Sequence, residues 1–126
     1  MKLNPQTRSW LGLLCIVMAV LAVQGWWKER RSVSTGAEVA ELARESPIRM
    51  MSSDVCAVCD QARHWMTEHQ VPFTECSIER DPKCRADFEA SRSPGTPVML
   101  VGEDRAIVGF SPERLRATLA RPQPSP

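Results

Sequence analysis

An uncharged apolar stretch near the start of the chain limits what the remainder can fold into. It runs for eighteen residues, from Trp10 to Trp27, and only one Gln and two Gly residues interrupt it. As a helix it would be about 27 Å long, close to the ~30 Å hydrocarbon core of a bilayer. Setting this stretch and its flanks aside from a chain of 126 residues leaves one small domain with a single core.

Two interpretations of this stretch stay open, a retained transmembrane anchor and a cleaved signal peptide. Trp10 at one end and the pair Trp26-Trp27 at the other match the preference of aromatic rings for the lipid interface, which favours the anchor. Val20 and Ala22 offer a small-residue cleavage site, which is typical of a signal peptide. We predict a single-pass membrane protein in which residues 10–27 form the anchor and residues 1–9 its N-terminal flank.

Charge divides unevenly along the chain. Five basic residues and one acidic residue flank the apolar stretch and contribute +4 to a formal net charge of +1, so residues 32–126 carry −3. A domain without a basic face cannot neutralise phosphates, and we therefore expect no nucleic-acid partner. The basic residues are split almost evenly between the two flanks, so both orientations stay open. We favour an extracytoplasmic (periplasmic) domain, because signal-like N-termini with early basic residues usually insert that way.

Hydrophobic patterning predicts a compact α/β domain over residues 47–120. Residues 28–46 are polar and predict a tether, and the proline-rich residues 121–126 predict a disordered tail. The predicted strands are 48–51, 71–78, 98–101 and 106–109, and the predicted helices are 57–69, 82–90 and 112–120. The order β-α-β-α-β-β-α gives a four-stranded mixed sheet with helices on both faces, which is a thioredoxin-like architecture.

Cys56 and Cys59 form a Cys-x-x-Cys motif at the predicted junction of the first strand and the first helix of this domain. Free N–H groups and the helix dipole stabilise a thiolate at such a junction, whereas an ordinary thiol of pKa ~8.5 is only about 3% ionised at pH 7. Asp54 and Asp60 oppose this effect, so we expect modest activation. We predict that Cys56 attacks a substrate disulfide and that Cys59 resolves the mixed disulfide.

The alternative for a Cys-x-x-Cys motif is half of a zinc site. The domain has two further cysteines, Cys76 and Cys84, but seven residues separate them, and they fall on a strand and a helix, unlike the ligands of zinc ribbons and fingers. We therefore predict no metal site. We expect Cys76 and Cys84 to be structural and reduced, with a bridge between them as the alternative, especially in an oxidising compartment.

The segment Ser93-Pro94-Gly95-Thr96-Pro97, taken with the Cys-x-x-Cys motif and the element order, resembles the glutaredoxins and thioredoxins. The resemblance covers most of residues 48–120 and is closest to the glutaredoxins and glutaredoxin-like redoxins. It implies a monomeric dithiol–disulfide oxidoreductase that acts on protein or small-molecule disulfides, with a cis proline beside the cysteines. It also implies a set of substrate-binding residues, namely Thr96, Pro97, Gly109, Phe110 and Ser111.

Two departures from the glutaredoxin pattern bear on the electron donor. Glutaredoxins usually have Pro and an aromatic residue between the cysteines and a Lys shortly before them, where this chain has Ala57-Val58 and Ser52-Ser53-Asp54. Their paired glycines and acidic turn are reduced here to Gly109-Phe110-Ser111. We expect no bound cofactor, and the candidate donors are glutathione, with weak coupling, and a flavoprotein reductase. The alternative outside enzymes is a membrane-tethered binding module whose cysteines are structural or bind a metal.

Overall fold

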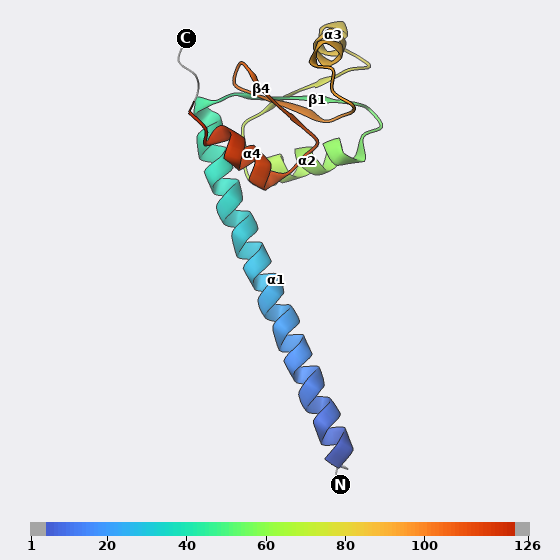
Figure 1. Cartoon of the computed structure of the whole chain (residues 1–126), viewed down its shortest axis with the longest axis vertical. Coiled ribbons are helices and arrows are strands. Elements are labelled where there is room, and N and C mark those ends of the chain that lie inside the picture. The colour runs from blue at the N-terminus through green and yellow to red at the C-terminus, as the bar shows by residue number, and fades with distance from the viewer. Residues whose placement is uncertain (1–4, 123–126) are drawn as a thin grey trace. The chain divides into compact units, whose positions relative to one another are not determined.

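The fold comes from a computed structural model that describes residues 5–122. Within this range the order of elements is α1-β1-α2-β2-α3-β3-β4-α4 (Figure 1). The predicted strands and helices of the domain are confirmed to within a few residues, and most of the predicted tail lies outside the described residues. The elements are α1 (Pro5–Glu45), β1 (Ile48–Ser52), α2 (Ala57–Glu68), β2 (Thr74–Ser77), α3 (Pro82–Ser91), β3 (Val98–Val101), β4 (Arg105–Val108) and α4 (Pro112–Leu119).

The chain divides into two compact units, residues 1–33 and residues 34–126. In the first unit the large apolar side chains of α1 from Trp10 to Trp27 are exposed. This helix contains a stretch long and apolar enough to cross a membrane. The guanidinium of Arg30 lies 4.0 Å from the centroid of the Trp26 ring, a cation–π contact of the kind that suits a membrane interface. By length and composition, α1 fits the predicted membrane span.

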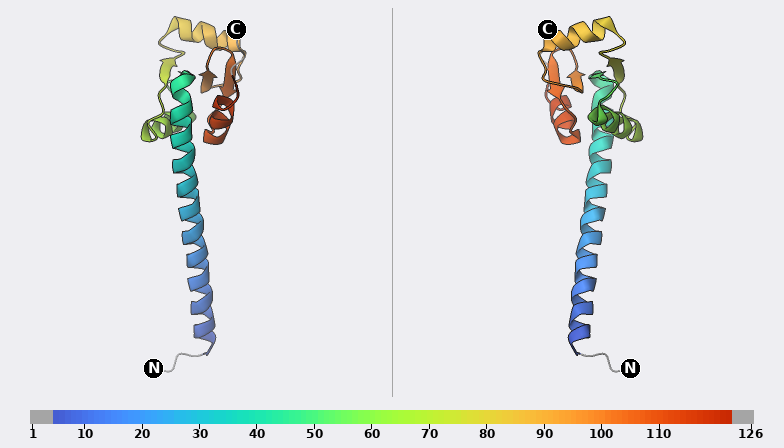
Figure 2. Two further views of the ribbon diagram at one scale, coloured as in Figure 1. Left: turned by 90° about the vertical axis from the view of Figure 1, so that its left-hand side faces the viewer. Right: turned by 90° about the vertical axis from the view of Figure 1, so that its right-hand side faces the viewer.

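The second unit is built on a four-stranded sheet in the order β2-β1-β3-β4. Strands β1 and β2 are parallel, and β3 is antiparallel to both β1 and β4. Helices α2 and α4 lie on one face of the sheet and α3 on the other, as the two side views also show (Figure 2). This arrangement is the thioredoxin-like fold that the element order predicts.

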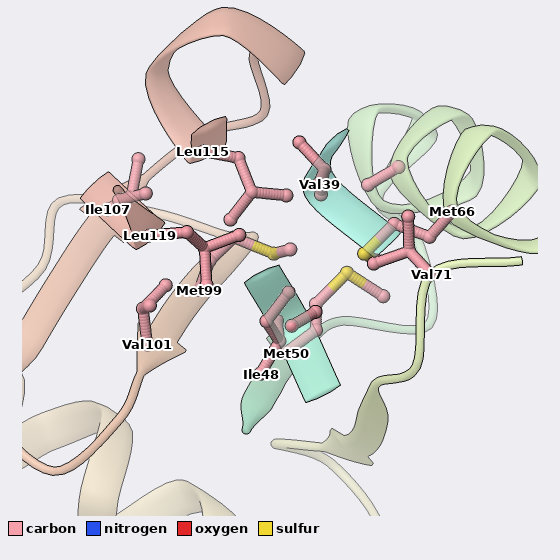
Figure 3. Close-up of a cluster of buried hydrophobic side chains, with 12 residues drawn as sticks. Val39, Ile48, Met50, Met66, Val71, Met99, Val101, Ile107, Leu115 and Leu119 are labelled. Atoms are coloured by element: carbon pink, nitrogen blue, oxygen red, sulfur yellow. The ribbon is translucent and has the colours of Figure 1, made fainter. Parts of the chain in front are cut away.

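Side chains on the strands alternate between two cores, as the period of two along a strand requires. On one face, Met50 of β1 and Met99 of β3 belong to the larger core, which α2 and α4 cover (Figure 3). On the other face, Met51 and Val98 form a smaller core with Cys84 of α3. Helices therefore cover both faces of the sheet, so a functional site is expected at the ends of the strands.

The domain begins earlier in the chain than predicted. The sequence predicts a tether over residues 28–46, whereas the compact unit begins at Ser34. Val39 and Ala43 of α1 are 0% and 4% exposed and belong to the larger core; Figure 3 shows Val39 among its side chains. This burial is not evident from the sequence because the segment is otherwise polar, and two apolar residues spaced by four make too short a stripe to indicate a buried helix face.

Two further contacts join residues 34–45 to the rest of the domain. The buried Gly36 lies so close to His69, the C-cap of α2, that a Cβ atom at residue 36 would lie 2.4 Å from the imidazole ring. Glu38 forms a 3.0 Å ion pair with Arg116 of α4. The last three turns of α1 are thus a structural part of the domain.

Candidate active site

Cys56 and Cys59 lie where β1 leads into α2. Cys56 is the N-cap residue of α2, and its sulfur accepts a hydrogen bond of 3.1 Å from the backbone N–H of Cys59. The two sulfurs are joined in a disulfide, with 5.2 Å between the Cα atoms. Cys59 is fully buried, whereas Cys56 is only partly buried. Cys56 is therefore the sulfur of this pair that an incoming group can reach.

The N-cap position stabilises a thiolate at Cys56 when the disulfide is reduced. The N–H groups in the first turn of a helix have no intrahelical partner, and the helix dipole adds positive potential there. The N–H of Cys59 already points at the Cys56 sulfur. Asp60 brings an opposing negative charge in the same turn, but Arg63 pairs with its carboxylate at 2.6 Å and neutralises part of it.

Thr96 and Pro97 are joined by a cis peptide bond, as the resemblance implies. In the antiparallel pairing of β1 with β3, Met51 lies opposite Val98. The end of β1, which leads to Cys56, and the start of β3, which Pro97 precedes, therefore share one edge of the sheet. The structure in this way brings Thr96 and Pro97 to the same edge as the cysteines.

Three of the predicted substrate-binding residues make structural contacts, namely Gly109, Phe110 and Ser111. The N–H of Gly109 donates a 2.8 Å hydrogen bond to the carbonyl of Pro97, and its φ of +80° favours glycine. The Phe110 ring packs against Trp65 of α2, with 5.6 Å between centroids. Ser111 is the N-cap of α4. The substrate-binding role of these three residues stays a prediction.

The loop between β1 and the cysteines is held by the loop that follows β2. Glu79 accepts hydrogen bonds from the Ser53 hydroxyl at 2.6 Å and from the backbone N–H of Asp54 at 3.2 Å. Asp54 in turn accepts a hydrogen bond from the Ser77 hydroxyl at 3.0 Å and pairs with Arg80 at 2.9 Å. Glu79 is not among the site residues predicted from the sequence. The one signal for it in the sequence is its place in the polar run that follows β2. Because β1 and β2 are parallel, this run lies at the same edge of the sheet as the loop that follows β1.

A polar cleft of about 800 Å³ opens beside this loop. Arg63 lies in its wall and pairs with Glu75 and Asp60 at 2.6 Å each, so much of the charge in the wall is neutralised locally. Cys76 also lines the cleft. Within residues 5–122, no three His, Cys, Asp or Glu side chains are grouped closely enough to hold a metal ion.

Cys76 and Cys84 form a second disulfide, with 6.0 Å between their Cα atoms. Our prediction that they are reduced is wrong. The link between β2 and α3 folds back tightly, because the N–H of Asp81 donates to the carbonyl of Ser77 at 2.9 Å and the Asp81 carboxylate caps α3. That turn brings the first turn of α3 within bridging distance of the end of β2.

Comparisons with known proteins identify the fold. No protein-family model and no curated protein sequence matches the chain. Among solved structures, the glutaredoxin-like protein NrdH-redoxin from Escherichia coli matches with a TM-score of 0.51 and 20% sequence identity, over 62% of this chain and 99% of that one. A chain from a study of thiol resolution in yeast mitochondrial 1-Cys peroxiredoxin matches with a TM-score of 0.48 and 17% identity, over 59% and 76%. The first match, which covers 62% of this chain, shows that the matched part has a thioredoxin-like fold.

Acid should destabilise the domain through the carboxylates near the cleft. The hydrogen bond from Arg63 lowers the pKa of Glu75 below its ordinary value of 4.5, and the hydrogen bond from Ser53 lowers that of Glu79. A carboxyl group whose pKa is lower in the folded state contributes stability above its unfolded pKa, and this contribution is lost as pH falls through the folded pKa. We expect a Tm that is steady down to about pH 5 and then falls.

Measuring the Tm of two variants as a function of pH tests the cause of this loss of stability in acid. Glu75→Gln should have a lower Tm at pH 7 and a shallower fall below pH 4.5, because the ionisable partner of Arg63 is gone. Glu89→Gln, at an exposed position on α3, should follow the wild-type curve. If the curves of Tm against pH were the same for Glu75→Gln and the wild type, Glu75 would not contribute to the loss of stability in acid.

Proposed function

We propose that this protein is a thiol–disulfide oxidoreductase in which Cys56 is the nucleophile and Cys59 the resolving cysteine. The observation that carries the proposal is the geometry of the pair. A partly buried sulfur at a helix N-cap is bonded to a fully buried sulfur one helical turn further on. A reactive thiol needs access and a stabilised thiolate, and a resolving thiol needs proximity and protection from competing partners.

The reaction follows from this division of roles. In the reducing direction, the Cys56 thiolate attacks one sulfur of a substrate disulfide, whose S–S bond breaks and whose leaving thiolate takes up a proton. The Cys59 thiol then loses its proton and attacks the Cys56 sulfur of the mixed disulfide, which releases the second substrate thiol and forms the Cys56–Cys59 disulfide. The substrate gains two electrons and two protons, and the dithiol loses both.

Protein disulfides are the substrate class that we propose. Val55, directly before Cys56, is 93% exposed, and Val58, between the cysteines, is 43% exposed. An apolar rim around a reactive sulfur suits an uncharged polypeptide surface better than a small, highly charged thiol. The proposal also places the domain outside the cytoplasm, tethered by α1. The Cys76–Cys84 disulfide supports this location, because such bonds persist in oxidising compartments.

Reduction of insulin by the full-length protein tests the proposed function. With dithiothreitol as the reductant, we expect the protein in detergent micelles to accelerate precipitation of the reduced insulin chains in a concentration-dependent way. A metal analysis of the same sample tests the alternative of a binding module. Stoichiometric zinc, together with no acceleration over dithiothreitol alone, would contradict the oxidoreductase proposal.

Glutathione should be a poor electron donor for this protein. The chain has no Lys shortly before Cys56 and no paired glycines followed by an acidic turn, so groups that would meet the charges of glutathione are missing. The loss of one charge-assisted hydrogen bond costs about 1.5–3 kcal/mol, or roughly ten- to one-hundred-fold in affinity. In a mixed-disulfide reduction assay with glutathione as the sole donor, we therefore expect much slower turnover than for an ordinary glutaredoxin at equal concentration. Fast, saturable turnover would refute this prediction.

A further inference from the structure

The two disulfides of the domain are connected through one short segment of chain, residues 77–83. The Cys76–Cys84 disulfide closes this segment at both ends. Near its middle, Glu79 accepts hydrogen bonds from Ser53, three residues before Cys56, and from the backbone of Asp54, two residues before it. We refer to residues 77–83 as the bridging loop.

We propose that the Cys76–Cys84 disulfide and Glu79 together position the loop before Cys56, so that the reactivity of Cys56 depends on the second disulfide. This inference rests on the proposed function, because it concerns the reactivity of the same nucleophile. Glu79, Cys76 and Cys84 are positioning residues in this proposal, since they act through Ser53 and Asp54 rather than on the substrate.

Hydrogen bonds join the end of β1 to the end of β2 and extend their pairing one residue beyond β2. The N–H of Ile78 donates a 2.9 Å hydrogen bond to the carbonyl of Ser52, and the Ser52 hydroxyl donates a 3.2 Å hydrogen bond to the carbonyl of Cys76. The bridging loop and the loop before Cys56 are therefore continuous with the parallel pair of strands. A displacement of one loop must break contacts with the other.

The contacts of Glu79 depend on the shape of the bridging loop. Glu79 and Asp54 are exposed, and hydrogen bonds of exposed side chains are easily replaced by water. Such hydrogen bonds persist when a stronger interaction holds the donor and acceptor groups in place. The covalent bond between Cys76 and Cys84 does this, because it restricts the conformations open to the seven residues between them.

Removal of the second disulfide should leave α3 docked on the sheet. Arg49 of β1 forms a 2.7 Å ion pair with Asp87 of α3, and the Asp81 carboxylate caps the same helix through the N–H groups of Lys83 and Cys84. These contacts do not require the S–S bond. The variant therefore tests the position of the bridging loop rather than the presence of α3.

Freeing the loop before Cys56 should weaken the N-cap geometry that stabilises its thiolate. The Cys56 sulfur accepts the Cys59 N–H only while Cys56 keeps its extended backbone conformation. When that conformation is less populated, we expect Cys56 to be alkylated about three- to tenfold more slowly at pH 7, a range set by the usual value of a helix N-cap. The pH midpoint of the alkylation rate should move upward.

The experiment measures the rate of Cys56 alkylation by iodoacetamide as a function of pH, in full-length protein whose Cys56–Cys59 disulfide has been selectively reduced. Mass mapping verifies the state of both cysteine pairs before each measurement. The test variants are Glu79→Ala and the double variant Cys76→Ala/Cys84→Ala. Glu79→Gln keeps one acceptor oxygen and should recover part of the rate. Two controls complete the set, Glu89→Ala on an exposed face of α3 and Leu119→Ala in the larger core, which lowers stability without touching either loop.

Slower alkylation in Glu79→Ala and in the double cysteine variant, partial recovery in Glu79→Gln and wild-type rates in both controls would support the proposal. Rates within twofold of the wild type in both test variants would overturn it. An equal slowing by Leu119→Ala would also overturn it, because general destabilisation would then be the cause. In either of these cases, normal insulin reduction by the wild type leaves the proposed function standing. No insulin reduction by the wild type would overturn the two proposals together.

Discussion

Cys56→Ser is expected to abolish insulin reduction, with a fall of at least about a thousandfold, because a serine hydroxyl is not ionised near neutral pH and cannot replace a thiolate nucleophile. Cys59→Ser should behave differently. Cys56 keeps its N-cap position and can still attack, but no second thiol resolves the product, so a mixed disulfide with insulin should accumulate. Non-reducing electrophoresis followed by mass mapping would detect this species and identify Cys56 as the attached residue.

Cys15→Ser is the matched control for both variants. Cys15 is an exposed residue of α1 in the first unit, and its replacement should change neither turnover nor trapping. If Cys56→Ser and Cys59→Ser trapped insulin equally, the assignment of nucleophile and resolving cysteine would be wrong. If Cys15→Ser reduced turnover as much as Cys56→Ser, the active thiol would lie outside the Cys-x-x-Cys motif.

The strands, the later helices and the placement of the Cys-x-x-Cys motif could be predicted from the sequence because their signals are local. Asp81-Pro82 and Ser111-Pro112 each combine an N-cap residue with proline in the first turn, and the structure starts α3 and α4 there. The apolar run of β1 ends just before Cys56, and the helical spacing that follows defines α2. Such signals need no knowledge of distant contacts.

The features that the sequence analysis missed depend on contacts between segments far apart in the chain. Glu79 lies 26 positions after Ser53, and nothing in the residue types indicates that their side chains meet. The disulfide between Cys76 and Cys84 depends on the tight turn at Asp81, and the N-cap signal at Asp81 does not indicate in which direction the chain turns. The burial of Val39 depends on side chains of α2 and α4, such as Met66 and Leu115, which come together only once the sheet has formed.

Val39→Asp tests whether residues 34–45 are part of the folded domain. Val39 is fully buried and packs in the larger core with Met66 of α2 and Leu115 of α4 (Figure 3). An aspartate there would be an unpaired buried charge, or a protonated carboxyl with unmade hydrogen bonds. We expect the free energy of unfolding to fall by about 3–5 kcal/mol, a large part of the ~5–15 kcal/mol available to a small domain.

Ala37→Asp is the matched control, because Ala37 lies on the exposed face of the same helix, two residues away. Its effect should stay within about 0.5 kcal/mol, as for most surface substitutions. Urea-dependent proteolysis of the full-length variants in detergent micelles reports the stability of the domain. If Val39→Asp and Ala37→Asp unfolded at the same urea concentration as the wild type, residues 34–45 would be a tether after all. If Val39→Asp alone unfolded at a lower urea concentration, the last turns of α1 would complete the core. The helix that carries the apolar stretch would then also be a structural element of the thioredoxin-like fold.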